Sequence, residues 1–170
     1  FITANGVVLV DTKNPNTGQS ILDQVKAVTS KPVTMVINTH THADHTGSNE
    51  FFKDNVVFVA QENTKSNMQK MTNFAGDNAK FLPSRTFKDT MTLGTGADQI
   101  VLYYFGPAHT SGDAWVVFPA LRAMHAGGPA GETFARITDA GRLAPPGPPP
   151  GGKQRGNLPP PRGRRGPVSP

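Results

Sequence analysis

Residues 38–47 read Asn-Thr-His-Thr-His-Ala-Asp-His-Thr-Gly, and this stretch of sequence decides the fold. The chain has only five histidines among 170 residues, yet three of them, His40, His42 and His45, fall within six consecutive positions. Histidine is the side chain that most often binds metals. The cluster therefore indicates a metal site rather than three unrelated surface or core histidines.

The spacing of these residues favours convergence on one ion. His40 and His42 are two residues apart, and side chains at i and i+2 of an extended segment point the same way. Asp44 and His45 follow the turn and face an adjacent position. A carboxylate beside an imidazole suits a second ion, or a base that orients a water molecule. The stretch thus predicts one metal position with a second one next to it.

The segments before the cluster predict two buried strands joined by a helix. Gly6–Asp11 is a short apolar, β-rich run followed by turn formers, and Val33–Asn38 is a second such run. Between them, Thr17 or Ser20 can cap an amphipathic helix that ends before Lys31. The cluster follows the second strand directly, so we expect it at that strand's C-terminal end.

The segments after the cluster alternate between helix and strand and then become rich in strands. We expect helices at 48–54 and 62–71, a strand at 56–60, and strands at 91–93, 99–105, 114–118 and 121–125. Residues 72–86 give no regular pattern. This order predicts an α/β (α+β) domain with strands of mixed direction.

Composition divides the chain near residue 127. Residues 1–126 contain ten Lys or Arg and ten Asp or Glu, whereas residues 127–170 contain seven and two, so the formal charge of +5 lies in the second part (7 − 2 = 5). That part also holds 11 of the 16 prolines and 10 of the 18 glycines. Such a sequence cannot support a packed core. We therefore predict a domain over residues 1–127 and a disordered Pro/Gly/Arg-rich tail over residues 128–170.

Residues 38–47 resemble the H-x-H-x-D-H signature of the metallo-β-lactamase superfamily. The strand that ends at Asp11 resembles an earlier motif of that family, whose aspartate supports the metal loop. The segment 106–110 resembles the later motif that supplies a third histidine, here His109, and 115–119 resembles the strand after it. The resemblance covers residues 6 to about 127. It implies a partial αββα sandwich followed by the disordered tail.

The same resemblance implies a zinc site and a reaction. His40, His42 and His109 would hold a first zinc ion, and Asp44 and His45 a second. A metal-bound hydroxide would attack an ester, amide, thioester or phosphoester, while the catalytic Asp44 positions the hydroxide and handles its proton. The implied protein is a β-lactamase-like hydrolase of a small molecule.

The sequence departs from the family pattern near the end of the match. The family continues with a Gly-Asp pair and a later histidine, but Gly128 stands where the aspartate is expected and no histidine follows. We therefore expect a complete first metal site, an incomplete second one, and a second sheet that is largely missing. The chain is also expected to be a fragment at both ends. One hypothesis is that a shift of reading frame produced residues 128–170, which resequencing of the DNA tests.

Two alternatives to an active hydrolase remain open. The chain can be a metal-binding fragment without catalysis, or a binding protein that acts through its Arg-rich tail on RNA or acidic surfaces. Assays with added zinc separate the first from an enzyme, and deletion of residues 127–170 tests the second through salt-dependent RNA retention. The neutral charge of residues 1–126 favours a small-molecule substrate over a nucleic acid. No run of 18 apolar residues occurs, so no membrane span is expected, and neither localisation nor oligomeric state is predicted.

Overall fold

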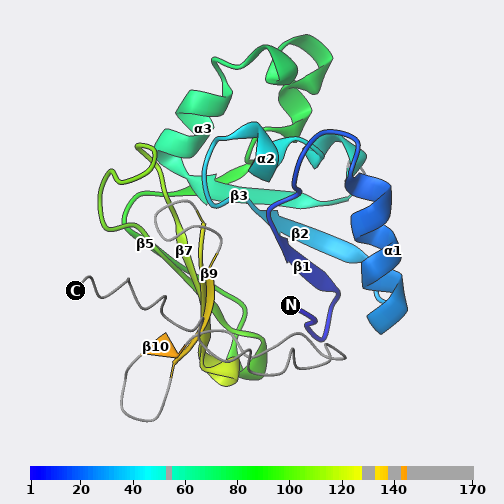
Figure 1. Ribbon diagram of the computed structural model, residues 1–170, viewed down its shortest axis with the longest axis vertical. Coiled ribbons are helices and arrows are strands. Elements are labelled where there is room, and N and C mark those ends of the chain that lie inside the picture. The colour runs from blue at the N-terminus through cyan, green and yellow to red at the C-terminus, as the bar shows by residue number, and fades with distance from the viewer. Residues whose placement is uncertain (53–54, 128–132, 138–142, 145–170) are drawn as a thin grey trace, which may run out of the picture.

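The computed structural model describes residues 1–52 and 55–127, together with the backbone of 133–137 and 143–144 (Figure 1). The strands are β1 (Val7–Val10), β2 (Val33–Ile37), β3 (Val57–Gln61), β4 (Arg85–Phe87), β5 (Thr90–Leu93), β6 (Ile100–Tyr103), β7 (Trp115–Phe118), β8 (Ala123–Ala126), β9 (Thr133–Ile137) and β10 (Leu143–Ala144). The α-helices are α1 (Gly18–Val28), α2 (Ala43–Thr46) and α3 (Glu62–Met68). Short 3-10 helices are η1 (Asn49–Phe51), η2 (Thr72–Phe74), η3 (Gly76–Phe81), η4 (Gly96–Asp98) and η5 (Pro119–Leu121).

The strands form two sheets of different character. Strands β1 to β4 make a parallel sheet in the order β1-β2-β3-β4, as expected for strands joined by helical crossovers. Strands β5 to β10 make an antiparallel sheet in the order β10-β9-β8-β7-β6-β5. In Figure 1 the helices lie on the side of β1–β3 that faces away from β5, β7 and β9. The described residues therefore form three layers: helices, parallel sheet and antiparallel sheet.

The parallel sheet is buried on both faces because alternate residues of its strands enter two different cores. Ile37 and Val59 point into an inter-sheet core, whereas their neighbours Val36 and Phe58 point into a helix-side core. The buried residues of the inter-sheet core are Val8, Ile37, Val59, Phe87, Leu93, Ile100, Leu102, Ala114, Val116 and Phe118. Those of the helix-side core are Val36, Phe52, Phe58, Met68, Phe74 and Phe81. Apolar runs in β1–β3 thus reflect packing on two sides.

The architecture confirms the predicted α/β class with strands of mixed direction. The expectation of a largely missing second sheet is wrong, because β5–β8 cover the inner face of the parallel sheet and share its core. Residues 72–86, which gave no pattern, contain η2, η3 and the edge strand β4. The expected helix at 48–54 is the 3-10 helix η1 instead.

Two short strands lie within residues 128–170, where we expected a disordered tail. β9 pairs with β8, and β10 pairs with β9, so the antiparallel sheet continues past residue 127. At these positions the structure differs from the expectation, which gave too little weight to the β-rich run at 133–137. The other residues of the segment lie outside the described part, and the division into domain and tail stays a prediction. Among the described residues, no helix is long and apolar enough to cross a membrane.

The inter-sheet core gives a direct test of this packing. Ile100 begins β6, is 1% exposed and belongs to the inter-sheet core. Replacement by alanine removes buried methyl groups and leaves a cavity, so Ile100→Ala is expected to lower the free energy of unfolding by roughly 2–5 kcal/mol. Urea denaturation measures the change. Val28→Ala, at a position that is 73% exposed, should change it by less than about 0.5 kcal/mol. Equal effects of the two substitutions would show that the sheets are not packed together.

Candidate metal centre

The histidine cluster lies in the loop that joins β2 to α2. The chain leaves β2 after Ile37, bends at His40 and Thr41, and enters α2 at Ala43. His42 precedes α2 in an extended conformation, and its carbonyl accepts the amides of His45 and Thr46. The cluster therefore sits at the C-terminal end of a buried strand, as predicted, although the segment is bent and not extended throughout.

The fourth histidine of the site comes from a distant loop between β6 and β7. His109 lies at the start of a turn that the Asp113 side chain closes. The two carboxylate oxygens of Asp113 accept hydrogen bonds from the Thr110 amide at 2.8 Å and from the Thr110 hydroxyl at 3.0 Å. Asp113 is only 1% exposed, so this turn is anchored in the interior. The turn fixes the backbone immediately after His109.

Helix α3 holds the same turn from the side. The Thr64 hydroxyl donates to the Gly112 carbonyl at 2.7 Å, and the Asn67 amide donates to the Ser111 hydroxyl at 2.9 Å. The Asn63 amide donates to the Ser111 carbonyl at 2.8 Å. A Cβ on Gly112 would lie 2.4 Å from the Thr64 hydroxyl oxygen, so a larger residue cannot approach α3 this closely. These contacts set the distance between the turn and the parallel sheet.

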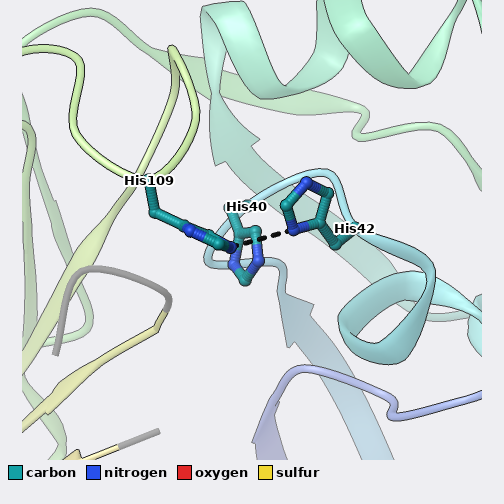
Figure 2. Close-up of side chains that lie close together, drawn as sticks. All are labelled: His40, His42 and His109. Atoms are coloured by element: carbon teal, nitrogen blue, oxygen red, sulfur yellow. Dashed lines mark hydrogen bonds between the residues drawn. The ribbon is translucent and has the colours of Figure 1, made fainter. Parts of the chain in front are cut away.

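Three of the five predicted site residues converge as a set of nitrogen donors. His40, His42 and His109 face one another in Figure 2, and their ligand atoms all lie within 4.8 Å of one another. His42 Nδ1 and His109 Nε2 are 3.0 Å apart. Tetrahedral zinc with Zn–N bonds near 2.0–2.1 Å requires N–N separations of about 3.4 Å. The set therefore needs only small side-chain movements to surround one zinc ion.

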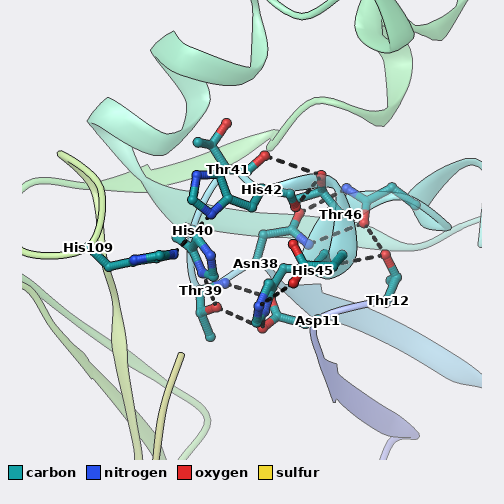
Figure 3. A network of polar contacts seen from close by, with 12 residues as sticks. Asp11, Thr12, Asn38, Thr39, His40, Thr41, His42, His45, Thr46 and His109 are labelled. Carbon is teal, nitrogen blue, oxygen red and sulfur yellow. Dashed lines mark hydrogen bonds and ion pairs between the residues drawn. The ribbon is translucent and has the colours of Figure 1, made fainter. Parts of the chain in front are cut away.

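The buried member of this set, His40, has a ring nitrogen that suits a metal. His40 is fully buried, and its Nε2 forms no hydrogen bond with any described residue. Its Nδ1 lies 3.1 Å from the Thr39 hydroxyl, whose only proton goes to Asp11 Oδ2 at 2.7 Å (Figure 3). The hydroxyl can then only accept from Nδ1–H, which leaves a lone pair on Nε2. A metal ion would satisfy this otherwise orphaned acceptor.

The electrostatic surroundings also keep His40 neutral. Burial, with smaller contributions from the nearby His45 and His42 and against the opposing effect of Asp11 and Asp113, lowers the pKa of His40 from 6.5 to about 4. A neutral imidazole is the form that binds metals. His40 is therefore ready to act as a ligand at neutral pH.

This lowered pKa predicts the pH dependence of the metal-free chain. Between pH 6.5 and about 4 the unfolded state binds the His40 proton and the folded state does not, so the stabilisation is full above pH 6.5 and is lost as the pH falls. The loss should reach at most about 2 kcal/mol at pH 5, which lies 1.5 units below 6.5. Urea denaturation between pH 7 and 5 in the presence of a chelator measures it. His40→Gln should flatten the dependence, and an unchanged slope in that variant would contradict the assignment.

Asp44 and His45, the two residues expected to hold a second ion, lie beside the set but are arranged differently. His45 is buried with its ring centroid 4.0 Å from that of His40, and its Nδ1 is 2.7 Å from Asp11 Oδ2. Asp44 is exposed, and its Oδ2 is 3.6 Å from His45 Nε2. Among the described residues, neither belongs to the three-histidine group. Their role as ligands stays a prediction, while Gly128 lies outside the described residues.

Several residues that shape the site gave no signal in the sequence. Asp113 and the polar side chains of α3 fix the turn after His109, and a buried amide pair, described below, supports the His40 loop. Isolated Asn, Thr and Asp residues are common in turns and helices, so their type and spacing do not identify a partner 40 residues away. Only the resemblance pointed to His109.

A family model described as the metallo-beta-lactamase superfamily matches residues 1–151. The match extends beyond residue 127, where we placed the end of the resemblance. Among curated proteins, the chain is 30% identical over 130 residues to a metallo-beta-lactamase type 2 from Elizabethkingia meningoseptica, covering 75% of this chain and 49% of that protein. The chain thus spans about half the length of this relative.

The chain is also similar to solved structures of metallo-beta-lactamases. A metallo-beta-lactamase from Pontibacter korlensis superposes with a TM-score of 0.59 at 28% identity, over 72% of this chain and 54% of that one. Metallo-beta-lactamase IND-7 superposes with a TM-score of 0.62 at 26% identity, over 74% of this chain and 55% of that one. In both cases the chain covers little more than half of the solved structure.

Proposed function

The chain belongs to the metallo-beta-lactamase superfamily, and from this premise we propose that it is a zinc-dependent hydrolase whose site is built on His40, His42 and His109. The observation that carries the proposal is the convergence of three imidazoles, of which the buried one presents an Nε2 lone pair without a protein partner. Zinc, when bound, supplies Lewis-acid chemistry that lowers the pKa of water and stabilises negative charge on an oxygen.

The residues of the chain divide the remaining tasks. His40 is buried and fixed, whereas His42 and His109 are exposed, so the set is open to solvent on one side. An open side leaves room for a water molecule and a substrate. Asp11 and Thr39 hold the His40 ring at its Nδ1, and this keeps Nε2 available to a metal shared with the other two histidines.

Asp44 is the group that we propose to handle the proton. Its side chain is 58% exposed and lies at the start of α2, next to His45 and within the same loop as His40 and His42. An exposed carboxylate beside the site can accept a proton from water and pass it to solvent. Asp44→Asn would keep the shape and remove this capacity, so it should lower the rate of hydrolysis more than the zinc affinity.

The substrate class that we propose is a small molecule with an ester, amide or thioester bond. The relatives are named metallo-beta-lactamases, which makes a β-lactam amide the first bond to test. Residues 1–126 carry no net charge, so they offer no general attraction to the phosphates of a nucleic acid. We therefore propose small acyl compounds, and not nucleic acids, as the substrates.

Hydrolysis assays on the full chain test the proposal. The chain is freed of metal with a chelator, reloaded with zinc, and given chromogenic β-lactam, lactone and thioester substrates, with His42→Ala as the matched variant. Zinc-dependent turnover that disappears in His42→Ala supports the proposal. Zinc binding without turnover of any substrate would show a metal-binding domain without catalysis. Turnover that is independent of zinc, or equal in His42→Ala, would overturn the proposal.

A further inference from the structure

A pair of buried asparagines closes the base of the histidine loop. The Asn38 amide donates to Asn49 Oδ1 at 3.1 Å, and the Asn49 amide donates to Asn38 Oδ1 at 2.8 Å. Neither residue is more than 1% exposed. Asn38 directly precedes the Thr39-His40 pair, and Asn49 follows the loop at the start of η1. The two amides therefore join the beginning and the end of the segment that carries His40, His42 and His45.

Asn49 also ties this segment to two other parts of the chain. Its Oδ1 accepts the Thr12 hydroxyl at 2.8 Å, and its Nδ2 donates to the Phe81 carbonyl at 3.4 Å. A side-chain amide offers two donors and two acceptor sites, and all four are used here. The Thr12 backbone amide in turn donates to the His45 carbonyl at 2.8 Å. Asn49 thus holds the loop against the segment after β1 and against the end of η3; Figure 3 labels three of the other residues of this network, Thr12, Asn38 and His45.

We propose that Asn49 is a positioning residue for the metal, acting through the Asn38–Asn49 amide pair. The pair holds the two ends of the loop together. It thereby fixes His40 and His42 at positions from which they and His109 can bind one metal ion. None of the side-chain hydrogen bonds of Asn49 goes to one of the three histidine rings. Without the pair, the loop must be ordered when a metal binds, and the free energy of that ordering weakens the affinity. This inference rests on the proposed zinc site.

Substitution of one or both asparagines separates positioning from folding. In Asn49→Leu the Asn38 amide stays buried without its partner, so the chain loses stability. In the double variant Asn38→Leu, Asn49→Leu no asparagine amide stays buried without its partner, so part of the stability should return, although the Thr12 hydroxyl and the Phe81 carbonyl still lose their bonds to Asn49. The amide pair is absent from both variants. If Asn49 positions the metal ligands, both variants should bind zinc about 10-fold more weakly than the wild-type chain.

The experiment measures zinc affinity of the full chains by competition with a chromogenic chelator, alongside urea denaturation of the metal-free forms. Ile100→Ala is the control, because it lowers stability from the first residue of β6, outside the loop, and should keep wild-type zinc affinity. Wild-type affinity in Asn49→Leu would overturn the inference. So would an affinity that recovers with stability in the double variant, because the pair would then serve folding only. Failure of the wild-type chain to bind zinc would overturn the proposed function, and this inference with it.

Discussion

His109→Ala is expected to weaken zinc binding by more than about 100-fold, the upper end of what the loss of a supporting group around a metal costs. His109 is the only member of the three-histidine group that comes from the antiparallel sheet side, and its Nε2 lies 3.0 Å from His42 Nδ1. Without it, His40 and His42 alone remain from that group to hold the ion. Competition with a chelator of known affinity gives the ratio of dissociation constants. Because His109 is exposed, the free energy of unfolding should change little.

His125→Gln is the matched control for this result. His125 is a histidine on β8, outside the group of converging donors in the described residues. Its replacement should leave zinc affinity within about twofold of wild type, a difference of less than 0.5 kcal/mol. If the two variants bound zinc equally well, His109 would not be a ligand.

Asp11→Asn is expected to lower zinc affinity by up to about 100-fold with almost no change in shape. Asp11 is buried, adopts a positive φ of 62°, which asparagine also tolerates, and accepts from the Thr39 hydroxyl and from His45 Nδ1. In Asp11→Asn an NH2 group takes the place of the accepting oxygen Oδ2, so it donates to the Thr39 hydroxyl and to His45 Nδ1 where Asp11 accepted from them. The Thr39 hydroxyl then donates its hydrogen bond to His40 Nδ1. The His40 ring therefore carries its own proton on Nε2, the atom that faces the metal position.

Nitrogen NMR of the imidazole rings reads this change directly. In the metal-free wild-type chain, His40 should carry its proton on Nδ1, and in Asp11→Asn on Nε2. Asp98→Asn is the control, since Asp98 accepts the Ala4 backbone amide at 2.7 Å as Asp11 accepts that of Thr39 at 2.8 Å, but Asp98 lies on η4, apart from the histidines. The same His40 tautomer in both variants, with equal zinc affinity, would rule out a role for Asp11 in setting the proton.

Short-range sequence patterns predicted those parts of the fold and site in which neighbouring residues act together. His40 and His42 are two positions apart, and the strands β1, β2 and β3 are apolar runs because both of their faces are buried. Strand β4 escaped prediction because its three residues, Arg85 to Phe87, include only one that enters the core. A strand this short at a sheet edge lacks enough positions to show a period.

Long-range polar contacts could not be predicted in this way. The Asn38–Asn49 pair and the contacts of α3 with residues 111 and 112 depend on which segments the two sheets bring together. The underestimated second sheet shows the same limit. Its strands β5 to β8 were predicted one by one, but how they pair, and that they cover the parallel sheet, depends on residues far apart in the sequence.

The convergence of three imidazoles on one ion is tested most directly by zinc-edge X-ray absorption of the full chain loaded with one equivalent of zinc. Three imidazole nitrogens at about 2.0–2.1 Å are expected in the wild-type spectrum, and two in that of His109→Ala. A spectrum with one imidazole or none, or one that does not change between the two chains, would contradict a metal centre built on His40, His42 and His109.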